Sequence, residues 1–274
     1  MDFDFTDTGT GPVLLFLPGS YSTHAVWKGV QNALTGSYRV VTTSLPGYGG
    51  TPEIRADTVR DMAQMVAFVV NVIDRIGAPV HLVGHSYGGL VAFAADLSDR
   101  VTPLSVMTFE GNPVFSRHSG DERPWMAEVL RINARFEDAF AAAAPDAAEI
   151  IIDYWGQPGM FAALPSQIQD YCRATAGTNI LDWRCASGFR PHVADYAAID
   201  MPCSIVRGQF ANPAIIDISA EIARHVPNAR SHVVPGSGHF LISTHPAECA
   251  GIIDRHMADF AESARVSPRN CGFP

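Results

Sequence analysis

The sequence predicts an α/β protein that has a mostly parallel central sheet, helices on both faces of the sheet, and an inserted helical lid. Two observations lead to this fold class. Short apolar segments alternate with amphipathic stretches, and one long interval, 112–200, contains no convincing strand. Alternating strands and helices are typical of βαβ units with buried parallel strands. The predicted parts are a core of residues 1–111 and 201–266, a lid of residues 112–200 and a flexible tail of residues 267–274.

The core strands are expected where short apolar or β-branched runs end in Gly, Pro or a polar residue. These runs are residues 13–17, 39–43, 80–83, 104–109, 203–207 and 230–234. Apolar residues at helical spacing predict core helices over 58–76, 86–97, 215–226 and 247–260, the first with Asp57 or Thr58 as its N-cap. Loops at the carboxyl ends of parallel strands meet at one edge of the sheet, so we expect the chemistry there.

The lid interval has helical patterns over 124–144, 146–154, 166–175 and 179–187, separated by Pro and Gly. It also holds three of the four tryptophans, Trp125, Trp155 and Trp183. These aromatic side chains can form a small core of the lid, contact an apolar substrate in a cleft below it, or do both. The candidate pocket residues are Trp125, Trp155, Met160 and Phe161 from the lid, and His24 from a loop of the core.

Composition excludes several classes of function. The formal net charge of −9 argues against nucleic acid as a partner, because phosphate binding needs clustered Lys and Arg. Five scattered cysteines without a C-x-x-C pair indicate free thiols in a reducing compartment. The N-terminus lacks the features of a signal peptide, and the apolar runs are too short to span a membrane. We therefore expect a cytoplasmic protein without membrane association, and nothing in the sequence indicates its oligomeric state.

A G-x-S-x-G motif stands at Gly84-His85-Ser86-Tyr87-Gly88, between an apolar strand and an apolar helix. A serine in such a sharp strand-to-helix turn adopts strained dihedral angles, and the flanking glycines avoid clashes. Its hydroxyl then lies near the helix N-terminus, where free N–H groups can stabilise an oxyanion. Ser86 is therefore the candidate nucleophile. The alternative is a Gly-rich turn in which the serine is incidental.

With this motif the chain resembles the α/β-hydrolase superfamily over most of its length. Leu17-Pro18-Gly19-Ser20 is similar to the family's His-Gly-x oxyanion turn, with Pro18 in place of the usual histidine. The segment 44–51 is similar to the family's D-x-P-G-x-G-x-S turn, with Ser44 in place of aspartate. The resemblance implies that the backbone N–H groups of Ser20 and Tyr87 form the oxyanion hole.

The resemblance also implies a catalytic histidine in the loop after the last strand. Val234-Pro-Gly-Ser-Gly-His239 occupies this place, so His239 is the candidate general base. His245, which precedes a proline, is its nearest rival. His85 is the residue before the serine, and its ring is expected to point away from the site.

The acid has two candidates. After the strand that follows the lid, where the family's acid is commonest, the chain has Asn212 and no carboxylate before Asp217. A second family arrangement places the acid after the preceding strand, where Glu110 ends an apolar run. We prefer Glu110, with Asp217 as the alternate, although a strand-end glutamate can also simply face water. Haloalkane dehalogenases and some lactonases of the superfamily use this second position, but the dehalogenases need an aspartate nucleophile, which Ser86 argues against.

Together these residues predict a serine hydrolase that cleaves a small to medium carboxylic ester or lactone through an acyl-enzyme. The expected partner is a small-molecule substrate. No cofactor or metal is expected, because phosphate-binding, dinucleotide-binding and H-E-x-x-H motifs are absent from the sequence. Two alternatives stay open. One is perhydrolase, haloperoxidase or lyase chemistry on the same triad without a cofactor. The other is a non-catalytic ligand-binding member, which the missing acid at the commonest position would favour.

Overall fold

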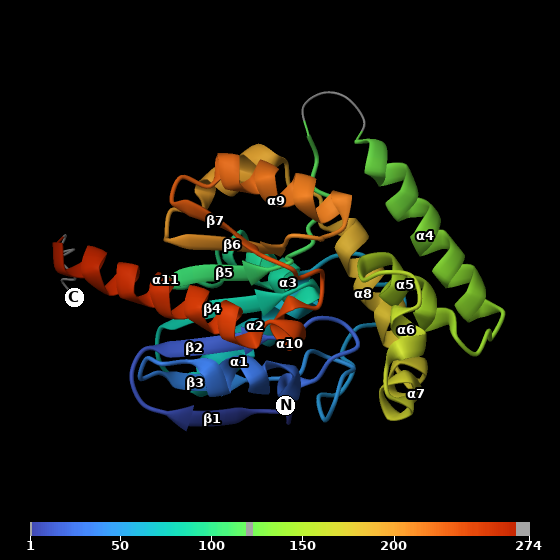
Figure 1. Cartoon of the computed structure of the whole chain (residues 1–274), viewed down its shortest axis with the longest axis horizontal. Coiled ribbons are helices and arrows are strands. Elements are labelled where there is room, and N and C mark those ends of the chain that lie inside the picture. Colours follow the sequence, from blue (N-terminus) through green and yellow to red (C-terminus); the bar gives the residue numbers. More distant parts are fainter. Residues whose placement is uncertain (1, 119–122, 267–274) are drawn as a thin grey trace.

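The computed structural model describes residues 2–118 and 123–266. Within them the chain forms a seven-stranded sheet with the order β1-β3-β2-β4-β5-β6-β7 (Figure 1). The strands are β1 (Thr6–Gly9), β2 (Val13–Leu17), β3 (Arg39–Thr42), β4 (Val80–His85), β5 (Ser105–Phe109), β6 (Cys203–Gly208) and β7 (Ala229–Val234). The β1–β3 pair is antiparallel and the other pairs are parallel. The prediction of a mostly parallel sheet is confirmed.

The described helices are α1 (Lys28–Ala33), α2 (Ala63–Ile76), α3 (Tyr87–Asp96), α4 (Pro124–Ala141), α5 (Ala147–Trp155), α6 (Met160–Ala163), α7 (Ser166–Ala174), α8 (Ala176–Gly188), α9 (Pro213–His225), α10 (Leu241–Thr244) and α11 (Pro246–Val266), with 3-10 turns η1 (His24–Trp27) and η2 (Val193–Ala198). All six predicted strands and eight predicted helices are present, with shifted ends. The edge strand β1 and the short helices α1, α6 and α10 were not predicted. The sequence of β1, Thr-Asp-Thr-Gly, is polar because an edge strand is exposed to solvent.

The apolar run of β2 shows why both faces of the sheet are covered. Successive side chains of a strand point to opposite faces. Leu14 and Phe16 pack in one core cluster with residues of α1 and α11, whereas Leu15 and Leu17 pack in another with residues of α2, α3 and α9. All four side chains are fully buried. The two core clusters hold the sheet between two helical layers, as the sequence predicted.

One predicted helix boundary is wrong. Helix α2 begins at Ala63 after an N-cap at Met62, and neither Asp57 nor Thr58 caps it. The residues before it instead form a loop that packs against α8. A Cβ atom added to Gly188 would overlap the carbonyl oxygen of Arg60, which shows how close the two segments lie. Tertiary contacts with α8 therefore override the helical pattern of 58–62.

Helices α4–α8 separate β5 from β6 in the sequence, and we call them the helical insertion. In Figure 1, α5, α6, α7 and α8 lie together beyond one end of the sheet, and α4 runs beside them. The insertion has a small core of its own, formed by Ala148, Ile152, Phe161 and Cys172. The predicted flexible tail, 267–274, lies outside the described residues.

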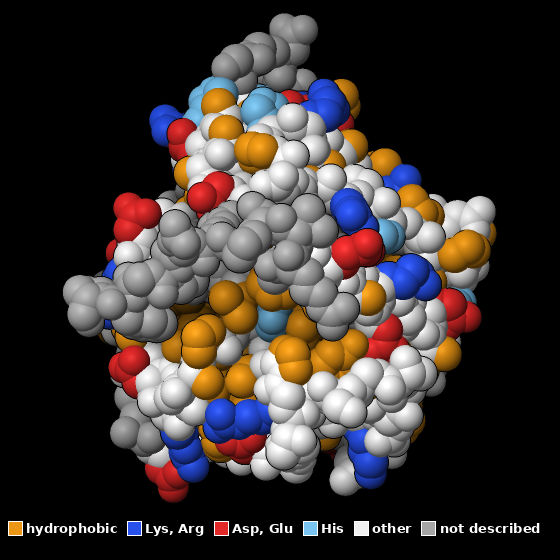
Figure 2. Space-filling view, turned by 90° about the vertical axis from the view of Figure 1, so that its left-hand side faces the viewer, with side chains coloured by type: hydrophobic (Ala, Val, Ile, Leu, Met, Phe, Trp, Pro, Cys, Tyr) orange, Lys and Arg blue, Asp and Glu red, His pale blue; other side chains and the backbone are white. Residues whose placement is uncertain are grey.

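The opposite end of the molecule is shown in Figure 2, where hydrophobic side chains gather around a histidine and charged side chains are scattered at the periphery. Of the five cysteines, Cys172, Cys185, Cys203 and Cys249 are buried free thiols, and Cys271 lies outside the described residues. None of the helices formed by residues 2–118 and 123–266 is both long and apolar enough to cross a membrane.

Candidate active site

Ser86 is the single residue between the end of β4 and the start of α3. Its dihedral angles, φ 51° and ψ −121°, place it in a conformation that is strained for a residue with a side chain. A Cβ atom on Gly84 would lie 2.4 Å from the carbonyl oxygen of Gly88, and one on Gly88 would lie 2.3 Å from that of Leu17. Both glycines are therefore required by close backbone contacts. This is the sharp strand-to-helix turn that the motif predicts.

The structure brings Ser86, His239 and Glu110 together. The Oγ atom of Ser86 lies 3.0 Å from Nε2 of His239, and Nδ1 of His239 lies 3.1 Å from Oε2 of Glu110. All three residues are buried, with at most 7% of their surface exposed. A carboxylate oxygen only accepts hydrogen bonds, so Nδ1 carries the hydrogen and Nε2 has its lone pair free toward the serine hydroxyl. This arrangement suits a serine that loses its proton to the imidazole.

Glu110 is held in place by backbone groups of β6, the strand beside β5. It directly follows β5, and its backbone N–H donates to the carbonyl of Val206 at 2.7 Å. Its φ of 54° turns it out of the strand direction. The second carboxylate oxygen, Oε1, accepts the N–H of Gly208 at 2.6 Å, which orients Oε2 toward His239. The backbone strain at both Ser86 and Glu110 is consistent with functional positions.

The alternate acid, Asp217, lies elsewhere, and that alternative is wrong. It sits on α9, where its carboxylate accepts Nη1 of Arg123 at 2.6 Å and Nε1 of Trp125 at 2.8 Å. Asn212 caps α9 by accepting the N–H of Ala214 and does not contact His239. Because α9 begins at Pro213, Asp217 lies a full turn into the helix and faces the insertion. The rival base His245 bonds to Thr244 rather than to Ser86.

The turn after β2 lies directly against the nucleophile. A Cβ atom on Gly19 would be 3.0 Å from Cβ of Ser86, and the carbonyl groups of Leu17 and Pro18 lie under Gly88. Tyr87 is the first residue of α3, so its N–H has no acceptor within the helix. Ser20 and Tyr87 both line the cavity beside Ser86. Ser20 and Tyr87 therefore lie beside the candidate nucleophile, at the place where the sequence predicts an oxyanion hole.

The ring of His85 was expected to point away from the site. It points instead toward the loop that carries His239. Its Nε2–H donates to the backbone carbonyl of His239 at 2.9 Å, and the two imidazole centroids lie 5.2 Å apart. Burial, together with the nearby His239, lowers the pKa of His85 to about 3. His85 is therefore neutral and supports the loop that carries His239.

A cavity of about 700 Å³ opens beside Ser86. Trp155 and Met160 line it, as predicted. The ring of Trp155 stacks on that of His239, with centroids 5.7 Å apart, and on that of Trp183, with centroids 6.2 Å apart. Trp183, another of the lid tryptophans, also lines the cavity, together with apolar residues that the sequence did not single out: Val114, Phe115, Ile151, Ile152, Leu164 and Phe240. The cavity wall is thus mostly apolar and comes largely from the insertion.

Three predicted pocket residues do not line this cavity. The His24 ring lies 3.4 Å from the hydroxyl of Thr42 and belongs to the η1 turn. Trp125 of α4 donates to Asp217 of α9. Phe161 is 3% exposed and packs in the core of the insertion. For Trp125 and Phe161, the structure shows packing against core clusters instead.

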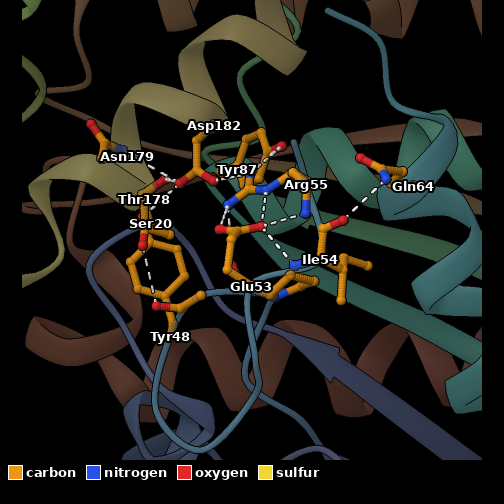
Figure 3. Close-up of polar contacts among 12 residues, drawn as sticks. Ser20, Tyr48, Glu53, Ile54, Arg55, Gln64, Tyr87, Thr178, Asn179 and Asp182 are labelled. Carbon is orange, nitrogen blue, oxygen red and sulfur yellow. Dashed lines mark hydrogen bonds and ion pairs between the residues drawn. The ribbon is translucent and has the colours of Figure 1, made fainter. Parts of the chain in front are cut away.

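A polar cluster that sequence reasoning missed lies at the cavity wall (Figure 3). Asp182 of α8 lines the cavity and is only 2% exposed. Its Oδ2 accepts the hydroxyls of Ser20 at 2.5 Å and Tyr48 at 2.6 Å, and its Oδ1 accepts Nη1 of Arg55 at 2.5 Å. The only signal in the sequence was a charged residue inside the apolar stretch Ile180-Leu-Asp182-Trp.

Arg55 has a fully buried side chain and two acidic partners, Asp182 and Glu53. Its Nε and Nη2 each donate to Glu53 at 2.8 Å, and Nη1 lies 3.4 Å from the hydroxyl of Tyr87. Burial raises the pKa of the Asp182 carboxyl, whereas the Arg55 guanidinium and the hydroxyls of Ser20 and Tyr48 act in the opposite direction. In the described part of the chain, no group of three or more His, Cys, Asp or Glu residues is placed to hold a metal ion.

The model of the alpha/beta hydrolase family matches residues 14–252. The pimeloyl-acyl-carrier-protein methyl ester esterase of Nitrosomonas europaea is 25% identical to this chain, with 90% of this chain and 96% of the relative covered. The enzyme of the same name from Methylococcus capsulatus is 23% identical, with 92% and 96% covered.

Two solved structures have a closely similar fold. MenH from S. aureus has a TM-score of 0.73 at 19% identity, covering 94% of this chain and 98% of that one. A thermophilic esterase from Thermogutta terrifontis has a TM-score of 0.72 at 22% identity, covering 94% and 93%. The family model spans well over half of the sequence, and the sheet and its helices agree with these structures. The chain therefore belongs to the α/β-hydrolase family.

Proposed function

We propose that this protein is a serine esterase that hydrolyses small to medium carboxylic esters or lactones through an acyl-enzyme. In this proposal Ser86 is the nucleophile, His239 the general base and Glu110 the acid that orients it. The observation that carries the proposal is the continuous hydrogen-bonded path from the Ser86 hydroxyl through both nitrogens of His239 to Glu110. The names of the esterase relatives support the same class of reaction.

In the first half of the reaction, Oγ of Ser86 forms a bond to the acyl carbon while its proton passes to Nε2 of His239. The carbonyl oxygen becomes negatively charged and accepts the N–H groups of Ser20 and Tyr87. When this intermediate collapses, the bond to the leaving oxygen breaks and His239 donates its proton to that oxygen. The alcohol leaves and the acyl group stays on Ser86.

In the second half, a water molecule attacks the acyl carbon and gives a proton to His239. The bond to Ser86 then breaks, His239 returns the proton to Oγ, and the carboxylic acid is released. Glu110 stays ionised throughout and stabilises the positively charged imidazole through Nδ1. The triad needs no cofactor for either half.

The cavity and the relatives guide the choice of substrate. A cavity of about 700 Å³ with mostly apolar walls fits an apolar acyl or alcohol group better than a polymer. The relatives are named for cleaving a methyl ester attached to an acyl-carrier protein. By this likeness, methyl esters of medium-length acyl chains, free or on an acyl-carrier protein, are the first class to test. The insertion forms one wall of the cavity, so it serves as the lid in this proposal.

The proposal is tested with a fluorophosphonate probe and a panel of p-nitrophenyl, methyl and lactone substrates. Wild-type protein is expected to be labelled at Ser86 and to hydrolyse at least one ester, whereas Ser86→Ala does neither. Ser98→Ala is a matched control, because Ser98 follows the far end of α3 and bonds only to the local backbone. Micromolar binding of an ester without turnover would favour a ligand-binding protein. Peroxide-dependent or elimination chemistry without hydrolysis would also contradict the proposal.

A further inference from the structure

Asp182 belongs to the insertion, yet it contacts the core beside the reactive serine. Its carboxylate accepts three donors from two core loops: Ser20 from the loop after β2, and Tyr48 and Arg55 from the loop after β3. Figure 3 shows these core side chains converging on Asp182, which belongs to α8. The carboxylate is almost completely buried. A buried, charged acceptor with several donors holds each of its partners in a narrow range of positions.

Both residues of the proposed oxyanion hole are attached to this cluster. The hydroxyl of Ser20 bonds directly to Asp182. The phenol of Tyr87 lies 3.4 Å from Nη1 of Arg55, and the same Nη1 donates to Asp182. The hydroxyl of Ser20 is thus engaged by Asp182, while the preceding residue, Gly19, lies directly against Ser86. One carboxylate therefore restrains the two amide donors from their side chains.

Two other residues of α8 also contact the core. Thr178, one turn before Asp182, donates to the carbonyl of Gly47 at 3.3 Å. A Cβ atom on Gly47 would lie 2.5 Å from Thr178, so only glycine permits this approach. Arg184 donates to the carbonyl of Asp57 at 3.3 Å. The position of Asp182 thus depends on how the insertion sits on the loop after β3.

On the basis of the proposed function, we propose that Asp182 is a positioning residue for the oxyanion hole. It holds Ser20 directly and Tyr87 through Arg55, so that their N–H groups point to where negative charge develops. Stabilisation of the oxyanion by the core residues therefore depends on how the insertion packs against the core. Amide donors stabilise the transition state only when they are placed within tenths of an ångström, so a small displacement reduces kcat.

The test is the nearly isosteric substitution Asp182→Asn, which removes the charge and weakens all three contacts. We expect kcat to fall about 10- to 100-fold while KM changes less than about threefold, because the lost interaction operates in the transition state. An alkyl trifluoromethyl ketone, which forms an oxyanion adduct with the serine, should bind more weakly by the same factor as kcat/KM falls. Inhibition by the carboxylic acid product should be unchanged.

Two further variants separate positioning from stability. Ser20→Ala keeps the backbone N–H but removes the contact to Asp182, and should cause a smaller loss of kcat. In the double variant with Asp182→Asn, the fold-loss in kcat should be smaller than the product of the two single losses, because both substitutions remove the same interaction. The matched control is Asp153→Asn, since Asp153 is also an acceptor inside the insertion, for the N–H groups of Gly159 and Phe161. It should lower Tm without changing kcat.

The outcomes are distinct. An unchanged or higher kcat in Asp182→Asn would overturn the positioning role. A rise in KM alone would also overturn it, because Asp182 would then be a substrate-binding residue. An equal loss of kcat in Asp153→Asn would overturn it as well, because the effect would then come from a general loosening of the insertion. If the wild-type protein itself shows neither labelling at Ser86 nor ester hydrolysis, the proposed function fails instead.

Discussion

The indole ring of Trp155 stacks on the imidazole of His239, with 27° between the ring planes and 5.7 Å between the centroids. Trp155 comes from α5 of the insertion, and His239 from the loop after β7. The insertion therefore forms one side of the proposed catalytic base as well as a wall of the cavity. Trp183 extends the same stack from α8. The base is thus positioned from one side by Glu110 and from the other by aromatic packing.

Replacing Trp155 with leucine removes this stack and enlarges the cavity. We expect kcat/KM to fall about tenfold, because both the ring of His239 and the bound acyl group lose a packing partner. The measurement is hydrolysis of p-nitrophenyl esters of increasing acyl length. Trp125→Leu is the matched control, since Trp125 lies outside the cavity, and it should leave kcat/KM within twofold. Equal losses in the two variants would argue against a specific role of Trp155.

Glu110→Gln should reduce kcat at least about tenfold with little change in KM. A glutamine that keeps its amide oxygen on the Gly208 N–H presents its NH₂ group to Nδ1 of His239. The imidazole must then accept at Nδ1, which places its hydrogen on Nε2 and removes the acceptor for the serine proton. Steady-state kinetics of the purified variant provide the measurement.

Asp217→Asn is the control for this assignment and should leave kcat within about twofold. Asp217 pairs with Arg123 and Trp125 at the surface of α9, with 32% of its side chain exposed. A surface ion pair of this kind contributes little to stability. If Asp217→Asn were the damaging substitution and Glu110→Gln the harmless one, the assigned acid would be wrong.

Stability should fall in mild acid because three histidines are buried in the neutral form. Burial lowers the pKa of His81 and of His256 to about 4, and that of His85 to about 3. Below pH ~6.5 the unfolded chain binds protons that these folded groups exclude, so the free energy of unfolding falls as the pH is lowered toward 4. Asp96 acts in the opposite sense, because burial raises its pKa to about 6 and its protonation favours the folded state.

Three histidines destabilise the fold and one aspartate stabilises it as the pH falls, so we expect the free energy of unfolding to be about 4 kcal/mol lower at pH 5 than at pH 7. Urea denaturation at the two pH values measures this difference. His256→Gln should reduce the difference, whereas His245→Gln, at a position bonded only to Thr244 and the local backbone, should not. A difference that is the same in wild type and His256→Gln would contradict the assignment.

Gly88→Ala should abolish most activity. The added Cβ would lie 2.3 Å from the carbonyl oxygen of Leu17, and both backbones would have to move apart. This displaces the turn after β2 from Ser86, so we expect kcat/KM to fall about 100-fold. Gly251→Ala is the control, because its Cβ meets only the flexible end of Arg255, at 3.5 Å, and a helical alanine is favourable. A fully active Gly88→Ala variant would show that the turn tolerates a shift.

Much of the fold and the candidate nucleophile Ser86 could be predicted from local patterns, whereas His239 and Glu110 were proposed from the family resemblance. Apolar runs mark the buried strands because both faces of β2, β4 and β5 are covered. The sharp turn at Ser86 is predictable because backbone sterics require glycine on both sides of it. The edge strand β1 was missed because an exposed edge carries no apolar pattern. The start of α2 was missed because contacts with α8 determine where this helix begins.

The sequence by itself determined the strand order along the chain, the strained turn and the candidate nucleophile, since these depend on neighbouring residues and steric rules. Only the tertiary structure decided which carboxylate reaches His239, which aromatic rings line the cavity and that Asp182 joins α8 to Ser20. These contacts connect residues more than a hundred positions apart, as Ser20 and Asp182 are. Their distances depend on how whole helices pack, which no local pattern encodes.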